Sequence, residues 1–112
     1  MVAKFVPERG DIVWLDFNPQ AGHEQSGRRP ALVLSTKGYN GKTNLAVVCP
    51  ITNKVKGYPF EVLLPEGPVT GAVLSDQVAS LDWVVRRAVR VAAVGDDILG
   101  EVLAKIVALI QL

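Results

Sequence analysis

The sequence has few of the residues that build metal and disulfide sites. It contains one cysteine, Cys49, and one histidine, His23, in 112 residues. A single cysteine excludes an internal disulfide and any zinc site made of several cysteines, and it fits a reducing compartment. A single histidine excludes a catalytic pair of histidines. We also find no P-loop, GxGxxG, GxSxG or HExxH motif, so we predict neither a cofactor nor a metal.

Long hydrophobic runs are also missing from the chain. Proline, glycine or a charged residue interrupts every apolar stretch before it reaches the roughly 20 residues that span a bilayer. The first residues contain no apolar segment followed by a cleavage site of small residues, so no secretory signal is predicted. We therefore expect a cytoplasmic protein without a membrane segment.

Charge of one sign is scarce, because the formal net charge is only +1. A protein that coats nucleic acid without sequence preference usually has a larger basic excess. The basic residues are instead grouped locally, Arg28 with Arg29, and Arg86 and Arg87 with Arg90. The second group either protects an edge strand from pairing or contacts a polyanion or a protein partner.

The residues that are present predict one mainly β domain over residues 1–112. Hydrophobic residues make up 49% of the chain, which is enough for a single core. Strand-forming residues and turn signals predict five to six antiparallel strands, at residues 11–17, 29–35, 45–52, 59–64, 72–79 and 88–94. Pro50 suggests a sheet edge or a bulge near the end of the third. This pattern is typical of a small, partly open SH3-like barrel.

The C-terminal segment has helical spacing from Asp96 onward. Asp96 and Asp97 are suited to cap its N-terminus, and Gly100 weakens it by about 1 kcal/mol relative to alanine. Its apolar stripe is wider than one packed face needs. We therefore expect the helix to pack on the sheet and also on a second subunit.

A hairpin argument places two chemically useful side chains together. If Asn40 and Gly41 form the turn between the second and third strands, residues equidistant from it face each other. Arg29 then lies opposite Thr52. The preceding polar loop lies beside this pair and carries four further polar residues, His23, Glu24, Gln25 and Arg28.

These residue types suit cleavage of a phosphodiester by the 2′-hydroxyl of RNA. That reaction needs a proton acceptor, a donor to the leaving oxygen, and positive charge at the phosphorane. Arginine supplies a fixed charge in a fork that matches two phosphate oxygens, and threonine supplies a hydroxyl. Lys56, Tyr58 and Phe60 alternate charge and aromatic rings, as RNA-binding surfaces do.

Several motifs in one order resemble the MazF/PemK (Kid-like) toxin family. They are GDIVWLDFNP, GHEQSGRRPALVLS, PITNKVKGYPFEV and GAVLSDQV, followed by the apolar C-terminal helix. The likeness runs from Gly10 to the end of the chain. It implies a type II toxin, a homodimeric, metal-independent endoribonuclease that cuts single-stranded mRNA at a short sequence, leaving 2′,3′-cyclic phosphate and 5′-hydroxyl ends.

The resemblance also implies roles for particular residues and a partner. Arg29 matches the family's catalytic arginine and Thr52 its catalytic threonine, while Glu24 and Gln77 match substrate-binding positions. His23 stands where several relatives have serine, and the general base stays open between Arg29, Glu24 and His23. The expected partner is an antitoxin of the MazE type, whose acidic C-terminal segment covers the RNA groove in a toxin–antitoxin hetero-oligomer.

Two other functions fit the same fold class. A CcdB-like toxin binds gyrase without catalysis, and it would need exposed target-binding residues at the end of the helix and no arginine–threonine pair. An SH3-like module would bind peptides in an aromatic groove, which an aromatic content of 6% supports poorly. The arginine and threonine motifs favour the nuclease.

Overall fold

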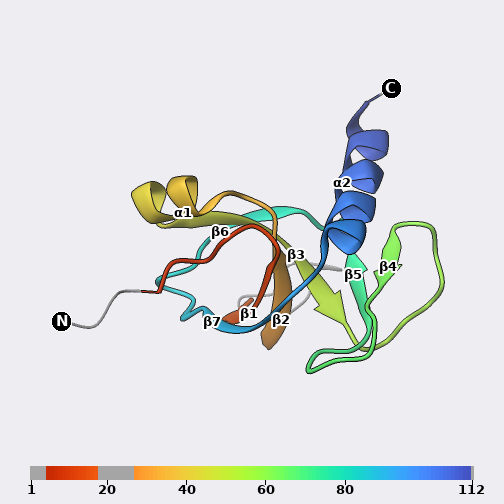
Figure 1. Ribbon diagram of the computed structural model, residues 1–112, viewed down its shortest axis with the longest axis horizontal. Helices are drawn as coiled ribbons and strands as arrows, with labels where there is room; N and C mark the ends of the chain where they lie inside the picture. Colours follow the sequence, from red (N-terminus) through yellow and green to blue (C-terminus); the bar gives the residue numbers. More distant parts are fainter. Residues whose placement is uncertain (1–4, 18–26, 112) are drawn as a thin grey trace.

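The computed structural model describes residues 5–17 and 27–111, which contain seven strands and two helices (Figure 1). These elements are β1 (Asp11–Asp16), β2 (Arg28–Val33), α1 (Lys37–Thr43), β3 (Leu45–Thr52), β4 (Glu61–Leu63), β5 (Ala72–Leu74), β6 (Ala79–Asp82), β7 (Val89–Ala93) and α2 (Asp96–Ile110). The predicted class, mainly β with a C-terminal helix, is confirmed. The strand count is seven, whereas five to six were expected.

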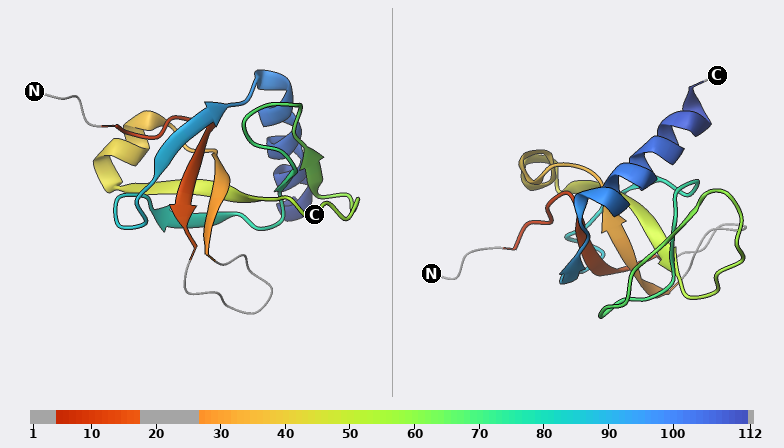
Figure 2. Two further views of the ribbon diagram at one scale, coloured as in Figure 1. Left: turned by 90° about the horizontal axis from the view of Figure 1, so that it is seen from below. Right: turned by 45° about the vertical axis from the view of Figure 1, so that its right-hand side comes forward.

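The strands pair antiparallel in the order β4-β5-β3-β2-β1-β7, and β6 pairs with the first half of β3. Among the described strands the path ends at β4 and β7, so the barrel is not closed. Figure 2 shows β1 and β2 side by side, with α2 standing at the β4 and β5 end of the sheet.

The seventh strand arises because the predicted strand at residues 72–79 is two strands. Ile51 pairs with Val73, and Val48 pairs with Ala79. The five residues 74–78 therefore lie opposite only two residues of β3, Cys49 and Pro50. The extra residues form a turn closed by the Gln77 N–H, which donates to the Leu74 carbonyl at 3.1 Å. Pro50, which has no N–H to donate, lies at this break in the pairing.

The predicted turn at Asn40 and Gly41 is wrong, because residues 37–43 form α1. The helix begins after Thr36, whose carbonyl and hydroxyl accept the N–H groups of Asn40 and Tyr39. It ends at Asn44, which has a left-handed φ of 60°. The helix is centred on Asn40, within one residue of the centre of the predicted turn. The predicted register between β2 and β3 is therefore still observed.

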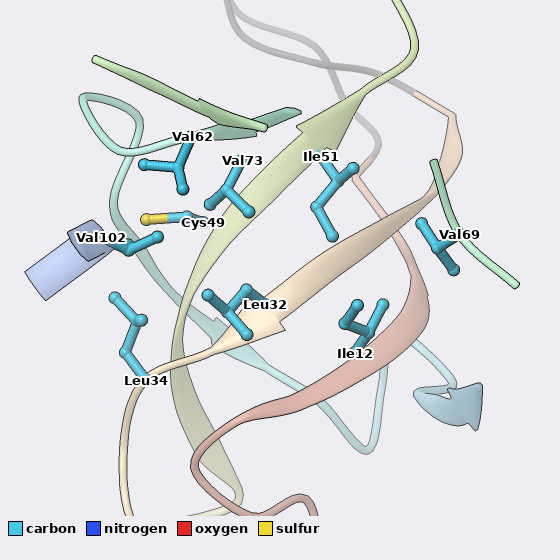
Figure 3. Close-up of a cluster of buried hydrophobic side chains, with 9 residues drawn as sticks. All are labelled: Ile12, Leu32, Leu34, Cys49, Ile51, Val62, Val69, Val73 and Val102. Carbon is cyan, nitrogen blue, oxygen red and sulfur yellow. The ribbon is translucent and has the colours of Figure 1, made fainter. Parts of the chain in front are cut away.

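Two buried clusters lie on opposite faces of the central strands, as strand alternation requires. One contains Leu15, Ala31 and Val48. The other contains Ile12, Leu32, Leu34, Cys49, Ile51, Val62, Val69, Val73 and Val102. Figure 3 shows Val102 of α2 reaching the second cluster beside Cys49. Burial raises the pKa of the Cys49 thiol to about 12, so the thiol stays protonated in the core.

Helix α2 starts at the predicted residue but with a different cap. Gly95 is its N-cap and makes no side-chain capping bond, so the predicted capping by Asp96 and Asp97 is wrong. Both aspartates lie in the first turn, where their charge favours the helix dipole. Further along, Val107 and Ile110 stay exposed. No helix of the described residues is long and apolar enough to cross a membrane.

Gly71 is the backbone position that the fold constrains most clearly. Its φ is +113°, and a Cβ there would lie 2.0 Å from the carbonyl oxygen of Thr52. A side chain would therefore push the end of β3 away from the start of β5. Gly100, in α2, has open space around it instead.

Replacing these two glycines by alanine should have opposite effects. We expect Gly71→Ala to lower the free energy of unfolding by about 2 kcal/mol or more, from backbone strain and overpacking. Gly100→Ala should raise it by about 0.5–1 kcal/mol, because alanine is the better helix former. Urea titrations measure both. Equal stability of Gly71→Ala and the wild type would contradict the close approach to Thr52.

Candidate functional site

A groove of about 550 Å³ opens where β1, β2 and β3 meet the connection between β4 and β5. It is lined by Trp14, Gly27, Arg28, Arg29, Pro30, Ile51, Asn53, Pro68, Val69 and Thr70. Its wall combines arginine, an exposed tryptophan and an amide with apolar residues. Such a mixture suits a ligand that has both charged and flat apolar parts.

Arg29 and Thr52 lie at the same end of the β2–β3 ladder. The ladder pairs Val33 with Val48, Leu32 with Cys49, and Ala31 with Pro50. This is the register predicted from the sequence, and continuing it by two residues leads to Arg29 and Thr52. Arg29 is half-buried and lines the groove, while the residues on either side of Thr52 line it too.

The hydroxyl of Thr52 is fixed by the backbone that follows it. Thr52 is only 6% exposed, and its Oγ1 accepts the Lys54 N–H at 3.1 Å. Because the oxygen serves as acceptor, the hydroxyl hydrogen can be donated elsewhere. Thr52 also pairs with Ala72 of β5, next to Gly71. Both strands and the turn therefore hold this side chain in place.

Arg28 lines the groove, but its guanidinium group is bound to the protein itself. It donates to Asp16 Oδ1 at 3.1 Å and to the Arg87 carbonyl at 2.6 Å. Asp16 also accepts from Arg87 Nε at 3.1 Å. These contacts tie β1 and β2 to the turn before β7. Arg28, whose binding to substrate stays a prediction, is thus held at the strand end that carries Arg29.

The two arginines stabilise the charged form of Asp16. The hydrogen bonds donated by Arg87, and then by Arg28, hold the pKa of Asp16 below its usual value of 3.8. Arg86 also contributes to this junction, donating to the Asp16 carbonyl at 2.9 Å, and Arg90 pairs with Asp11 at 3.0 Å. The second arginine group therefore binds carboxylates and carbonyls of its own chain.

Lys56 and Gln77 belong to two surface segments that a hydrogen bond joins. Tyr58, two residues after Lys56, donates its hydroxyl hydrogen to Asp76 at 2.8 Å, and Gln77 follows Asp76 directly. Burial, and then this bond, raise the pKa of Tyr58 to about 12. Lys56 is exposed and Gln77 half-buried. The two predicted substrate contacts thus lie on neighbouring segments.

Three predicted site residues, His23, Glu24 and Gln25, lie outside the residues that the structure describes. Within residues 5–17 and 27–111, no group of three or more His, Cys, Asp or Glu side chains is arranged to hold a metal ion.

Trp14 and Asn53 line the groove although neither was among the predicted site residues. Trp14 is 38% exposed. Its neighbours Val13 and Leu15 are fully buried, so strand alternation already places Trp14 on the other face. Asn53 directly follows Thr52, so its position in the sequence already places it near the predicted site.

Residues 8–110 match the model of the family described as PemK-like, MazF-like toxin of type II toxin–antitoxin system. The chain is 46% identical to the endoribonuclease toxin MazF of Escherichia coli strain K12, over 98% of this chain and 99% of the relative. It is 38% identical to the endoribonuclease toxin ChpB of the same strain, over 99% and 100% of the two chains.

Solved structures agree with the sequence relatives. MazF from Deinococcus radiodurans superposes with a TM-score of 0.94 at 54% identity, covering 97% of this chain and 100% of that one. A MazE–MazF complex from the same organism contains a chain with a TM-score of 0.87 and 47% identity, covering 97% and 99%. The chain belongs to the MazF-like, PemK-like toxin family. It is an endoribonuclease toxin of a toxin–antitoxin system. These matches favour the predicted nuclease over the alternative of a CcdB-like gyrase binder.

The ion pairs of Asp16 should make the stability of this MazF-like toxin depend on acid pH. Because folding lowers the pKa of Asp16, the contribution of its ion pairs to stability is complete above the unshifted pKa of 3.8 and is lost as the pH falls through the lower folded value. We expect the gap in unfolding free energy between wild type and Asp16→Asn to stay constant from pH 8 to pH 5 and to narrow below pH 4.

Chemical unfolding at a series of pH values measures this gap. Arg87→Gln removes the largest cause of the shift, so its stability should fall with acid less steeply than that of the wild type. A gap between wild type and Asp16→Asn that is unchanged down to pH 3 would rule out a stabilising role for these ion pairs.

Proposed function

We propose that the groove beside Arg29 and Thr52 binds single-stranded mRNA and cleaves it at a specific short sequence without a metal ion, which inhibits translation and growth. The β2–β3 register carries this proposal, because it brings a permanently charged arginine and a fixed threonine hydroxyl to one end of the sheet. The exposed Trp14 supports it as well, since an aromatic ring beside arginines suits a nucleobase next to its phosphate.

The reaction that fits these groups uses the RNA's own 2′-hydroxyl. The 2′-oxygen bonds to the adjacent phosphorus, the bond from phosphorus to the 5′-oxygen breaks, and a proton moves to that leaving oxygen. The products are a 2′,3′-cyclic phosphate and a 5′-hydroxyl. Arg29 stabilises the charge of the phosphorane, and Thr52 donates its hydroxyl hydrogen to a phosphate or leaving oxygen.

The other predicted substrate contacts are His23, Glu24, Gln25, Arg28, Lys56 and Gln77. Lys56 and Gln77 contact the RNA from the two segments that the bond between Tyr58 and Asp76 joins. The 2′ proton is taken up by Arg29, Glu24 or His23. A guanidinium group does not give up its proton in proteins and is therefore a poor base, which leaves phosphorane stabilisation as the better role for Arg29.

A cleavage assay in EDTA on a long, mixed-sequence RNA tests this function. The wild type should cut at discrete sites and leave 5′-hydroxyl ends. Arg29→Ala should lower kcat/KM by about 10²–10³, the usual cost of removing one preorganised charge donor. Thr52→Val, which keeps the shape and removes the hydroxyl, should cost about a hundredfold or more.

Two controls make the assay specific. Lys42→Ala removes a positive charge from the exposed surface of α1 and should leave cleavage unchanged. A substrate with a single 2′-deoxy nucleotide before the cut should resist the wild type. Cleavage of that substrate, or equal rates for Arg29→Ala and wild type, would overturn the mechanism.

We also propose that the toxin forms a homodimer in the cytoplasm and a hetero-oligomer with an antitoxin of the MazE type. The exposed apolar side chains of α2, among them Val107 and Ile110, support the dimer, and the MazE–MazF complex of D. radiodurans supports the antitoxin. An acidic antitoxin segment would compete with RNA for the groove arginines.

Light scattering should therefore give twice the chain mass, and Ile110→Glu should shift the protein toward the monomer. A co-expressed antitoxin should abolish RNA cleavage, and its acidic segment alone should inhibit less as salt increases. A wild type that is monomeric at micromolar concentration would contradict the proposed homodimer. Full RNA cleavage by the stable toxin–antitoxin complex would contradict the proposed inhibition by the antitoxin.

A further inference from the structure

The segment between β3 and β4 has little contact with the core at its start. Residues 53–57 are all exposed and belong to no strand or helix. Two side chains bind their backbone N–H groups. Thr52 accepts from Lys54, and Glu61 accepts from Lys56 and Gly57. The conformation of these residues therefore depends on the two acceptors.

Glu61, the first residue of β4, provides the larger share of these bonds. Glu61 is only 9% exposed. Oε1 and Oε2 each accept the Lys56 N–H at 3.1 Å, and Oε1 accepts the Gly57 N–H at 2.6 Å. Bonds from N–H groups to a carboxylate are stronger than those between neutral groups. Glu61 thus acts as an anionic anchor for the loop.

The backbone at Gly57 makes this anchor possible. Its φ of +82° is left-handed, a conformation that turns consecutive N–H groups toward one anion. No atom would lie within 4 Å of a Cβ at Gly57, so packing around this residue does not fix the turn. The hydrogen bonds to the Glu61 carboxylate fix it instead.

The second half of the same connection is held by other groups. Tyr58 is bound to Asp76, and Lys105 of α2 donates to the Pro59 carbonyl at 2.5 Å. Loss of the Glu61 carboxylate should therefore release residues 55–57 and leave Lys54 and the later residues in place. The Glu61 carboxylate thus controls a short part of the connection whose first residue, Asn53, lines the groove.

These hydrogen bonds explain why an acidic residue can lie near a groove that binds a polyanion. A bare carboxylate there would repel RNA, but both oxygens of Glu61 accept from the loop backbone. The loop that it fixes starts at Asn53, which lines the groove with Arg29, and carries Lys56. The amide and the ammonium group can bind base edges and phosphate. The position of Lys56 relative to Arg29 depends on the bonds to Glu61.

We propose that Glu61 is a positioning residue that determines which nucleotides the groove accepts beside the cut phosphate. The proposal rests on RNA cleavage at Arg29 and Thr52 as stated above. Glu61 does not touch the RNA. It acts through the backbone of Lys56 and Gly57, which sets where Lys56 meets the substrate.

The test compares wild type, Glu61→Gln, Glu61→Ala and the control Glu66→Gln, an exposed glutamate in the β4–β5 connection. Short RNAs carry the mapped cut sequence or single-nucleotide changes around it. We expect Glu61→Ala to reduce the discrimination between these RNAs in kcat/KM by about tenfold, mainly through KM. Glu61→Gln keeps one acceptor oxygen and should retain part of the discrimination. Glu66→Gln should retain all of it.

A purely structural role predicts a different result. If Glu61→Ala lowers cleavage of all RNAs by the same factor, the proposal is wrong. Amide hydrogen exchange without RNA gives a second measurement, in which the Lys56 and Gly57 N–H groups should exchange faster in Glu61→Ala than in wild type. The Lys54 N–H, held by Thr52, should keep its rate. Unchanged exchange at Lys56 and Gly57 would also overturn the proposal.

These measurements separate two kinds of failure. A folded wild type that cleaves no RNA would overturn the proposed function, and the claim about nucleotide choice with it. Normal cleavage by the wild type with unaltered discrimination in Glu61→Ala would overturn only the role of Glu61. If Glu61→Ala does not fold, Glu61→Gln carries the same comparison.

Discussion

The eight residues of β3 are the constraint on which the rest of the structure depends. One edge of this strand pairs with β2, and the other pairs first with β6 and then with β5. Its alternate side chains enter both hydrophobic clusters. The strand ends at Thr52, so the packing that fixes β3 also fixes the position of the threonine hydroxyl. The placement of the proposed catalytic threonine is here a consequence of strand pairing.

Carboxylates determine how the basic residues are used. Asp16 binds Arg28 and Arg87, and Asp11 binds Arg90, so several arginines that look available in the sequence serve to join strands. Glu61 orders a loop in the same manner, with backbone N–H groups in place of arginines. A net charge of +1 is therefore compatible with an RNA groove, because the positive charge that the substrate meets is local and depends on where the acids lie.

The sequence predicted the fold class, most strands, α2 and the β2–β3 register, because alternation and helical spacing are strong local signals. The sequence-based prediction failed where a second local signal or tertiary pairing outweighed the signal that was used. Asn40 and Gly41 form part of a helix because Thr36 caps it, and residues 72–79 divide because β3 pairs with them in two registers. The location of the groove was predictable through Arg28 and Arg29, which line it, and through Thr52 beside it. The roles of Arg28 and Glu61 depend on contacts across 12 residues and on backbone N–H directions, which no spacing reveals.

Cys49 has a consequence for how the protein responds to its surroundings. Oxidants and electrophiles modify cysteine through the thiolate, and a buried thiol with a pKa of about 12 has almost none at neutral pH. Since this is the only cysteine in the chain, folded protein offers such reagents no sulfhydryl target. We therefore expect the activity of the folded protein to be insensitive to reagents that modify thiols.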